Sequence, residues 1–261
     1  MTSEYGRISV IVAMESELQH LPGLPALPAP GGTPWPSTTW RQGQLEVTAV
    51  LCGIGMIRAA AATESAIARH RPDAILNFGC TGSHRHDVRV GDVVIGTRSV
   101  AHTSMVIGPD GTPRFDLHDG REAPPPGETG VASDPELLRI ARECARDWTP
   151  DPWGDDTVAV HPPRVHEGVV ASADVWTQSP AAIEALAERH HSMCEDMEAA
   201  AIAGICELHG VPFLTIKDIS NNELLQATVF DPDMAHLPAE EVGRRAAILT
   251  GRILDAIAAR R

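Results

Sequence analysis

The stretch EDMEAAAIAGICELHGVPFLTIKDIS, residues 195–220, contains a helix signal followed at once by a strand signal. Small apolar residues predict a helix over residues 197–209, and Gly210 stands where helices commonly end in the left-handed conformation. The apolar run that follows predicts a buried strand over residues 211–219. A helix connected to a buried strand by a short turn is typical of α/β proteins.

The same alternation extends over most of the chain. Further strands are predicted over residues 7–14, 46–52, 73–79, 91–100 and 164–171. Further helices are predicted over residues 56–69, 180–190 and 240–259, the second with Ser179 as its N-cap and Pro180 at its first position. This order predicts an α/β/α sandwich around a parallel or mixed sheet, in a single domain over residues 1–261.

Two stretches interrupt the alternation. Residues 21–36 and 107–130 are too rich in Pro and Gly to form regular elements. Long loops in compact domains are often lids or interface arms, but a solvated connection is an equal alternative here.

Composition excludes several classes of protein. Of the 261 residues, 43% are hydrophobic, and the formal net charge is −14 without any run of Lys or Arg. Nucleic acids and anionic membranes bind basic faces, so neither is expected as a partner. No apolar run is long enough to span a membrane, and the N-terminus shows no signal-peptide pattern. A small molecule in a local pocket is compatible with this composition.

The cysteines and histidines favour a cytoplasmic protein without a metal site. Five cysteines are scattered without CxxC spacing, so disulfides and structural zinc are not expected. The histidines form no HExxH or other paired-ligand spacing. We therefore expect a reducing compartment, and neither a metal nor another cofactor.

Polar or glycine-containing segments follow several predicted strands, where open α/β sheets bind their ligands. Glu15 and Glu17 follow the first strand, although both could simply lie in the first turn of a helix. CGIGM (residues 52–56) and NFGCTGSH (residues 77–84) are turns whose backbone N–H groups could approach a ligand. Neither contains the GxGxxG pattern of dinucleotide-binding proteins.

Charged and amide side chains gather at two further positions. Glu195, Asp196 and Glu198 stand at the start of the helix over residues 197–209, where capping is the favoured interpretation. The alternative is that one of these carboxylates faces inward and accepts hydrogen bonds from two ribose hydroxyls. Asn221 and Asn222 follow the strand over residues 211–219, and Asn222 is predicted to be a turn residue because Asn tolerates the left-handed conformation.

Six motifs in the same order resemble the purine nucleoside phosphorylase/nucleosidase superfamily, and within it the 5′-methylthioadenosine/S-adenosylhomocysteine nucleosidases. The motifs are AMESEL, CGIGMIRAAAATE, RPDAILNFGCTGS, VRVGDVVIG, VASADVW and EDMEAAAIAGICELHGVPFLTIKDIS. The resemblance covers nearly the whole chain apart from the two loop regions. It implies a phosphorylase/hydrolase-like sandwich around a mixed, partly closed sheet, a homodimer, and cleavage of the N-glycosidic bond of a purine nucleoside.

The resemblance also implies roles for single residues. Glu17 falls on the water-activating glutamate, Glu198 on the glutamate that binds the ribose hydroxyls, and Met197 on the residue beneath the sugar. Trp176 falls on the aromatic residue that stacks on the base. The small residues that line the site in the family fall on Cys80, Thr81, Gly82 and Ser220.

Asn221 falls on the catalytic aspartate, which in the family protonates the leaving purine at N7. An amide cannot donate that proton outright, but it can hydrogen-bond to N7 and to a group at position 6. Three hypotheses follow. The protein prefers 6-oxopurine nucleosides, as family members with Asn at this position do. It cleaves adenine nucleosides with Asp218 or an ordered water as the proton source. Or it is a catalytically weak protein that binds nucleosides as a sensor.

Hydrolysis is favoured over phosphorolysis, which is the alternative within the superfamily. Phosphorylases carry Arg in the N-terminal loop and ahead of the second glycine turn, whereas this chain has AMESEL and Asn77 at these places. Glu17 would repel a phosphate ion by its like charge. Arg58 follows the CGIGM turn and is interpreted as a solvated helix residue.

Overall fold

The computed structural model describes residues 5–27, 34–110, 113–114, 127–152, 162–228 and 241–260. Ten strands of the described residues form one sheet. They are β1 (Arg7–Val12), β2 (Ser37–Gln42), β3 (Leu45–Leu51), β4 (Ala74–Ser83), β5 (Val93–Ala101), β8 (Val131–Ala132), β9 (Val165–Ser172), β10 (Ser192–Asp196), β11 (Phe213–Asn222) and β12 (Ala227–Thr228).

The sheet is mixed and partly closed, as predicted. Its strand order is β12-β11-β5-β9-β10-β4-β1-β3-β2, and β8 pairs with β5. Because β11 also pairs with β4, the strands from β11 round to β4 close on themselves. The pairs β1–β4 and β4–β11 are parallel, so the carboxyl ends of these three strands meet at one edge.

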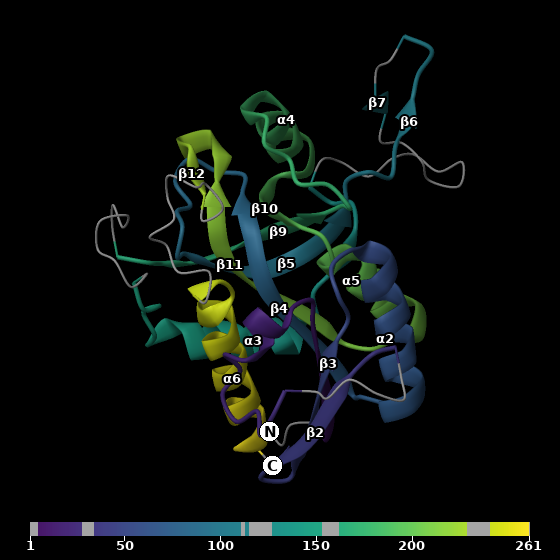
Figure 1. Ribbon diagram of the computed structural model, residues 1–261, viewed down its shortest axis with the longest axis vertical. Helices are drawn as coiled ribbons and strands as arrows, with labels where there is room; N and C mark the ends of the chain where they lie inside the picture. The colour runs from purple at the N-terminus through teal and green to yellow at the C-terminus, as the bar shows by residue number, and fades with distance from the viewer. Residues whose placement is uncertain are drawn as a thin grey trace.

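Helices cover both faces of the sheet (Figure 1). They are α1 (Glu15–Leu18), α2 (Met56–His70), α3 (Pro135–Arg146), α4 (Pro180–His190), α5 (Ala199–His209), the 3-10 helix η1 (Glu223–Leu225) and α6 (Arg244–Ala258). Helices α2 and α5 pack together on one side, and α3 and α6 pack together on the other. This arrangement confirms the predicted α/β/α sandwich. The short strands β6 (Val106–Ile107) and β7 (Pro113–Arg114) pair as a hairpin that extends away from the sheet.

The buried strands supply apolar side chains to both helical layers. In β1, Ile8, Val10 and Val12 belong to a cluster with residues of α3 and α6, whereas Ile11 belongs to a cluster with residues of α2 and α5. Successive side chains of a strand point to opposite faces, so a continuous apolar run is what a sheet covered on both sides requires. This is why the strand predictions from apolar runs were right.

Differences between prediction and structure lie mainly at element boundaries and in short elements. The helix predicted from residue 197 begins at Ala199, and Gly210, with a φ of 63°, ends it as predicted. Strands β2 and β10 and helix α3 were not predicted. The α3 signal is present in the sequence, because Pro135 follows Asp134, whose carboxylate accepts hydrogen bonds from the N–H groups of Glu136 and Leu137.

Asn222 does not adopt the predicted left-handed conformation. Its φ is −142°, and its Oδ1 accepts a hydrogen bond of 3.1 Å from the N–H of Leu224. Its Nδ2 donates to the carbonyl oxygens of Arg85 and Val88, both at 2.8 Å. Asn222 therefore ties the end of β11 to the loop after β4, and Gln226 takes the left-handed conformation at this turn, with a φ of 55°.

The two predicted loop segments lie only in part within the described residues. Residues 28–33 and most of residues 107–130 fall outside them. Among the described residues, no helix is long and apolar enough to cross a membrane. A single domain over residues 1–261 stays a prediction.

Candidate active site

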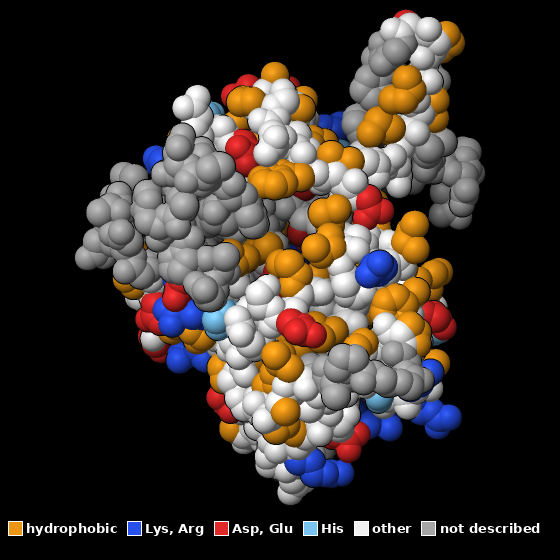
Figure 2. All heavy atoms as spheres, viewed as in Figure 1, with side chains coloured by type: hydrophobic (Ala, Val, Ile, Leu, Met, Phe, Trp, Pro, Cys, Tyr) orange, Lys and Arg blue, Asp and Glu red, His pale blue; other side chains and the backbone are white. Residues whose placement is uncertain are grey.

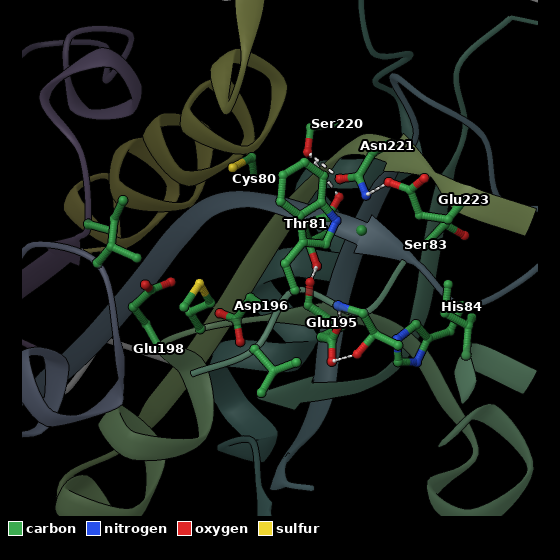
Figure 3. A pocket seen from close by; sticks show the side chains of 18 of the residues that line it. Cys80, Thr81, Ser83, His84, Glu195, Asp196, Glu198, Ser220, Asn221 and Glu223 are labelled. Carbon is green, nitrogen blue, oxygen red and sulfur yellow. Dashed lines mark hydrogen bonds between the residues drawn. The ribbon is translucent and has the colours of Figure 1, made fainter. Parts of the chain in front are cut away.

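A cavity of about 270 Å³ opens at the edge where the carboxyl ends of β1, β4 and β11 meet (Figure 3). All nine residues that the sequence placed in the site line this cavity. They are Glu17, Cys80, Thr81, Gly82, Trp176, Met197, Glu198, Ser220 and Asn221. Figure 2 shows hydrophobic side chains around the hollow in this face of the molecule.

Glu17 lies inside the cavity wall, in the single turn of α1. Its carboxylate accepts hydrogen bonds from the N–H of Cys80 at 2.8 Å and of Met14 at 3.2 Å, and the residue is 2% exposed. Burial raises its pKa, against these hydrogen bonds and the charge of Lys217. Glu15, two residues earlier, is exposed. The alternative of a simple first-turn carboxylate is therefore right for Glu15 and wrong for Glu17.

Glu198 lies in the same cavity, held by the CGIGM turn. Its Oε1 accepts a hydrogen bond of 2.9 Å from the N–H of Gly55, whose φ of 107° only glycine adopts readily. The next N–H of the turn, from Met56, donates to Asp174 Oδ1 at 2.7 Å. Burial, and then the charge of Asp196, raises the pKa of Glu198 to about 7. The turn's N–H groups therefore bind protein carboxylates.

Asp196 has a different role from Glu198. Its carboxylate accepts a hydrogen bond of 3.0 Å from the N–H of Ala199 at the start of α5, and lies 2.6 Å from Lys217 Nζ. Both charged side chains are about 1% exposed. Although burial acts to lower the pKa of Lys217, the charges of Asp196 and Glu198 raise it, so that the lysine stays protonated. Capping is thus the right interpretation for Asp196 and the wrong one for Glu198.

Asn221 lies at the far end of the cavity from Glu198, with its amide held on both sides (Figure 3). Its Nδ2 donates a hydrogen bond of 3.2 Å to Glu223 Oε1, and its Oδ1 accepts one of 3.0 Å from Ser220 Oγ. An ionised carboxylate can only accept, so Glu223 fixes the amide nitrogen on its own side. One N–H of the amide and one acceptor position of its oxygen are left for a ligand.

Comparison with known proteins decides the family. The chain matches the family described as the Phosphorylase superfamily over residues 7–259. The chain belongs to the phosphorylase superfamily. It is 31% identical over 219 residues to the 5′-methylthioadenosine/S-adenosylhomocysteine nucleosidase of Chromohalobacter salexigens. The aligned residues cover 82% of this chain and 84% of the relative. The corresponding protein of Bacillus thuringiensis is 29% identical over 219 residues, 82% of this chain and 85% of that one.

Solved structures agree with this superfamily fold. The 5′-methylthioadenosine/S-adenosylhomocysteine nucleosidase of Neisseria meningitidis, in complex with methylthio-immucillin-A, is similar with a TM-score of 0.73 and 23% identity, covering 96% of this chain and 99% of that chain. The futalosine hydrolase of Helicobacter pylori is similar with a TM-score of 0.73 and 21% identity, covering 95% of this chain and 97% of that chain.

In this superfamily member Asp218 does not reach the site, so the hypothesis that it supplies a proton is wrong. It is fully buried on β11 and is not among the residues that line the cavity. Its Oδ2 accepts a hydrogen bond of 3.0 Å from the N–H of Arg245 in α6, and the guanidinium lies 3.6 Å away. Because side chains alternate along a strand, Lys217 and Asp218 point to opposite faces of the sheet.

Sequence reasoning missed several residues of the cavity, among them Glu195, Thr177, His84 and Glu223. Glu195, three residues before Glu198, was considered in the sequence analysis but was assigned to capping. What separates Glu195 from Glu198 is the strand β10, in which Glu195 pairs with Gly82 of β4, and no local sequence pattern indicates that pairing. His84 follows the NFGCTG turn, and burial lowers the pKa of its imidazole to about 4, so it is neutral at physiological pH.

Proposed function

We propose that this member of the phosphorylase superfamily is a purine nucleosidase, an N-glycosyl hydrolase that converts a purine nucleoside and water to free base and sugar. The observation that carries this proposal is the pair of buried carboxylates, Glu17 and Glu198, in one cavity with Trp176 and Asn221. The names of the relatives, nucleosidases of purine-containing compounds, support the same reaction.

Glu17 is the residue we assign to water. Hydrolysis of an N-glycosidic bond passes through an oxocarbenium-like state, in which water adds to the anomeric carbon as the base departs. A carboxylate whose pKa is raised by burial is a stronger base than a free one and so is suited to take a proton from that water. The N–H groups of Met14 and Cys80 hold the carboxylate in place, so it need not reorganise during the reaction.

Glu198 is the residue we assign to the sugar. When ionised, it can accept hydrogen bonds from vicinal hydroxyls with the positions that Gly55 leaves open. Its negative charge also stabilises the positive charge that develops on the ribose ring. Met197, its neighbour in the cavity wall, offers an apolar surface to the sugar.

The charges of the cavity favour water over phosphate. Among the described residues, no Lys or Arg lines the cavity, whereas Glu17, Glu198, Glu195, Asp196 and Glu223 do. The N–H groups of the CGIGM turn, which could have bound an anion, donate to protein carboxylates. Arg58 is exposed on α2.

Asn221 is the residue we assign to the leaving base. Its remaining N–H can donate to N7 of the purine and so stabilise the negative charge that the base acquires. Full protonation by a general acid is worth roughly 10²–10⁴-fold, and an amide supplies only part of that effect. A purine that leaves readily without protonation would suit this site best.

We also propose that the protein is a cytoplasmic homodimer. Three apolar side chains that line the cavity remain exposed, Ile54 at 53% and Val175 and Trp176 at 46% each, and Ile57, three residues after Ile54, is 80% exposed. The hydrogen bond from Met56 to Asp174 brings their two segments together. A second copy seated on this patch would cover it and restrict access of solvent to the site. The molar mass in solution, measured by light scattering, tests the dimer.

The proposed reaction is tested by base release from a panel of purine nucleosides in phosphate-free buffer, followed by chromatography. We expect free base and free sugar, with no increase when phosphate is added. Strict dependence on phosphate, with sugar 1-phosphate as the product, would identify a phosphorylase instead. Binding without any base release would favour a nucleoside sensor.

A further inference from the structure

Glu195 is a buried carboxylate in the cavity wall that the proposed reaction does not use. It is 8% exposed and lines the cavity opposite Asn221. Figure 3 shows Asn221 and Glu223 on one side of the cavity and Glu195 on the other. An ionised carboxylate is costly to bury, so a buried carboxylate in a cavity wall needs hydrogen-bond donors as partners.

The sheet places Glu195 and Asn221 in one row across three strands. Gly82 of β4 pairs with Asn221 of β11 on one side and with Glu195 of β10 on the other. Neighbouring strands are about 4.8 Å apart, so the two outer residues stand about 10 Å apart. Gly82 has no side chain, and a Cβ atom there would lie 2.9 Å from Asn221 Nδ2. The missing side chain of Gly82 therefore makes room for the amide of Asn221, which lies over this glycine and across the row from Glu195.

Thr177 donates two hydrogen bonds to the Glu195 carboxylate, and His102 lies close to it. Thr177 donates to Oε1 from its hydroxyl at 2.8 Å and to Oε2 from its N–H at 3.0 Å. His102 Nε2 lies 2.7 Å from Oε1. Burial acts to raise the pKa of Glu195, but the contacts with His102 and Thr177 outweigh it, so the pKa is lowered and the group is ionised. A carboxylate has about four acceptor positions, which leaves one open on Oε2.

The open acceptor lies beside the surface on which a base would stack. Thr177, which holds Glu195, directly follows Trp176, and both line the cavity. A base stacked on the indole would therefore bring one edge toward Asn221, which has an N–H to donate, and another toward Glu195, which can only accept. The site offers a donor at one edge and an acceptor at the other.

Purine bases differ in whether they match this pattern. A 6-oxopurine has the acceptors N7 and O6 on one edge and the donor N1–H next to them, and guanine adds the 2-amino group. Adenine has a donor at position 6 and a lone pair at N1, which an ionised carboxylate repels. We propose that Glu195 selects the base, by accepting the N1–H of a 6-oxopurine while the open N–H of Asn221 donates to N7. This inference rests on the proposed function, because a nucleoside must occupy the cavity.

Binding of the free bases tests the inference independently of catalysis. We would measure, by calorimetry, the affinity of the full-length protein for hypoxanthine, guanine and adenine. We expect the 6-oxopurines to bind roughly 10- to 100-fold more tightly than adenine, the loss that an unpaired buried polar group produces. Equal or tighter binding of adenine, or no binding of any base, would overturn the inference.

The substitution Glu195→Gln sharpens the test because its amide nitrogen can donate to N1 of adenine. We expect the ratio of affinities, and the ratio of kcat/KM for inosine over adenosine, to fall by about tenfold or more. Glu188→Gln, an exposed position on α4, is the matched control and should leave both ratios unchanged. An equal loss for inosine and adenosine in Glu195→Gln would show that Glu195 only supports the Thr177 segment, and would overturn the inference.

Failure of the inference and failure of the proposed function give different results. Release of adenine from adenosine at least as fast as hypoxanthine from inosine leaves the nucleosidase in place and removes the role of Glu195. Selective binding of 6-oxopurines that Glu195→Gln abolishes, without release from any nucleoside, supports the role of Glu195 and removes the nucleosidase.

Discussion

The two ends of the cavity hold their carboxylates in opposite ways. At the sugar end, hydrogen bonds to Glu17 and Glu198 do not offset burial, and the pKa of each is raised. Glu195 is also buried, but His102 and Thr177 outweigh burial, and its pKa is lowered. The pKa of Glu198 is thus about 7 and that of Glu17 is raised above its ordinary value, whereas Glu195 keeps a fixed charge.

This difference separates chemistry from recognition. A proton acceptor gains from a pKa that is raised above its ordinary value, as that of Glu17 is, and Glu198 beside it has a pKa of about 7. Recognition needs hydrogen-bond donors and acceptors whose protonation does not change. Asn221 and Glu195, which flank Gly82 in one row of the sheet, meet this condition. In our proposal the sugar end performs the reaction and the base end chooses the substrate, so substitutions at the two ends should affect different measurements.

The largest expected effect is at the sugar end. Glu17→Gln removes the proposed base, and we expect kcat for base release to fall by roughly 10²–10⁴-fold, with nucleoside affinity retained. The amide nitrogen of Gln would face the N–H of Met14 or Cys80, which costs roughly 1–3 kcal/mol of stability. Single-turnover kinetics measures the rate of base release, and calorimetry measures the nucleoside affinity. Thermal unfolding shows that the variant is folded.

Glu15→Gln is the matched control for this substitution. Glu15 lies in the same short helix but is exposed, so removal of its charge should change kcat little. A near-normal rate in Glu17→Gln would remove Glu17 from its role. A comparable loss in Glu15→Gln would attribute the effect to the charge of the segment rather than to one carboxylate.

A smaller effect is expected at the base end. Asn221→Asp places a carboxyl group 3.2 Å from the position of Glu223 Oε1, and repulsion between the two favours the protonated form of the new acid. Such an acid can protonate N7, so we expect cleavage of adenosine to accelerate by about 10²-fold, the lower part of the range for general acid catalysis. Initial rates for inosine and adenosine, compared between variant and parent, measure the change.

The double variant Asn221→Asp with Glu223→Gln tests the stated cause. Without the charge of Glu223 the new aspartate loses the group that keeps it protonated, so we expect part of the acceleration to disappear. If Asn221→Asp leaves the profile of substrates unchanged, the amide does not determine how the base leaves, and the contrast between the two ends is weakened.

Sequence alone predicted the fold and the positions of Glu17 and Glu198 in the cavity wall. Apolar runs such as β1 are continuous because both faces of the sheet are covered, and Gly210 marked the end of α5 as expected. Glu17 and Glu198 were placed in the site by their motifs, and both line the cavity. Local periodicity and motif position carry this information directly.

At the base end, Trp176 and Asn221 were placed by their motifs, but the position of Glu195 could not be predicted because it depends on long-range pairing. Glu195 and Asp196 are neighbours in sequence, yet one faces the cavity wall beside Thr177 and the other pairs with Lys217. Likewise Lys217 and Asp218 differ only in the face of β11 to which they point. A shift of one residue in strand register exchanges such faces, and no local pattern in a polar segment fixes the register.

The remaining expected effect, about tenfold for one pH unit, is the pH dependence of the sugar end. Because the pKa of Glu198 is raised to about 7, the group is protonated below that pH and ionised above it, and the ionised form is the one that accepts from ribose hydroxyls. We expect kcat/KM to fall by about tenfold for each pH unit below 7, and to level off above about pH 8. Glu195, with its lowered pKa, stays ionised over this range and should not shift the preference between inosine and adenosine. Initial rates for both substrates from about pH 5 to pH 9 test both statements. A flat profile would separate Glu198 from catalysis, and a change of substrate preference with the same midpoint would show that the two ends are not independent.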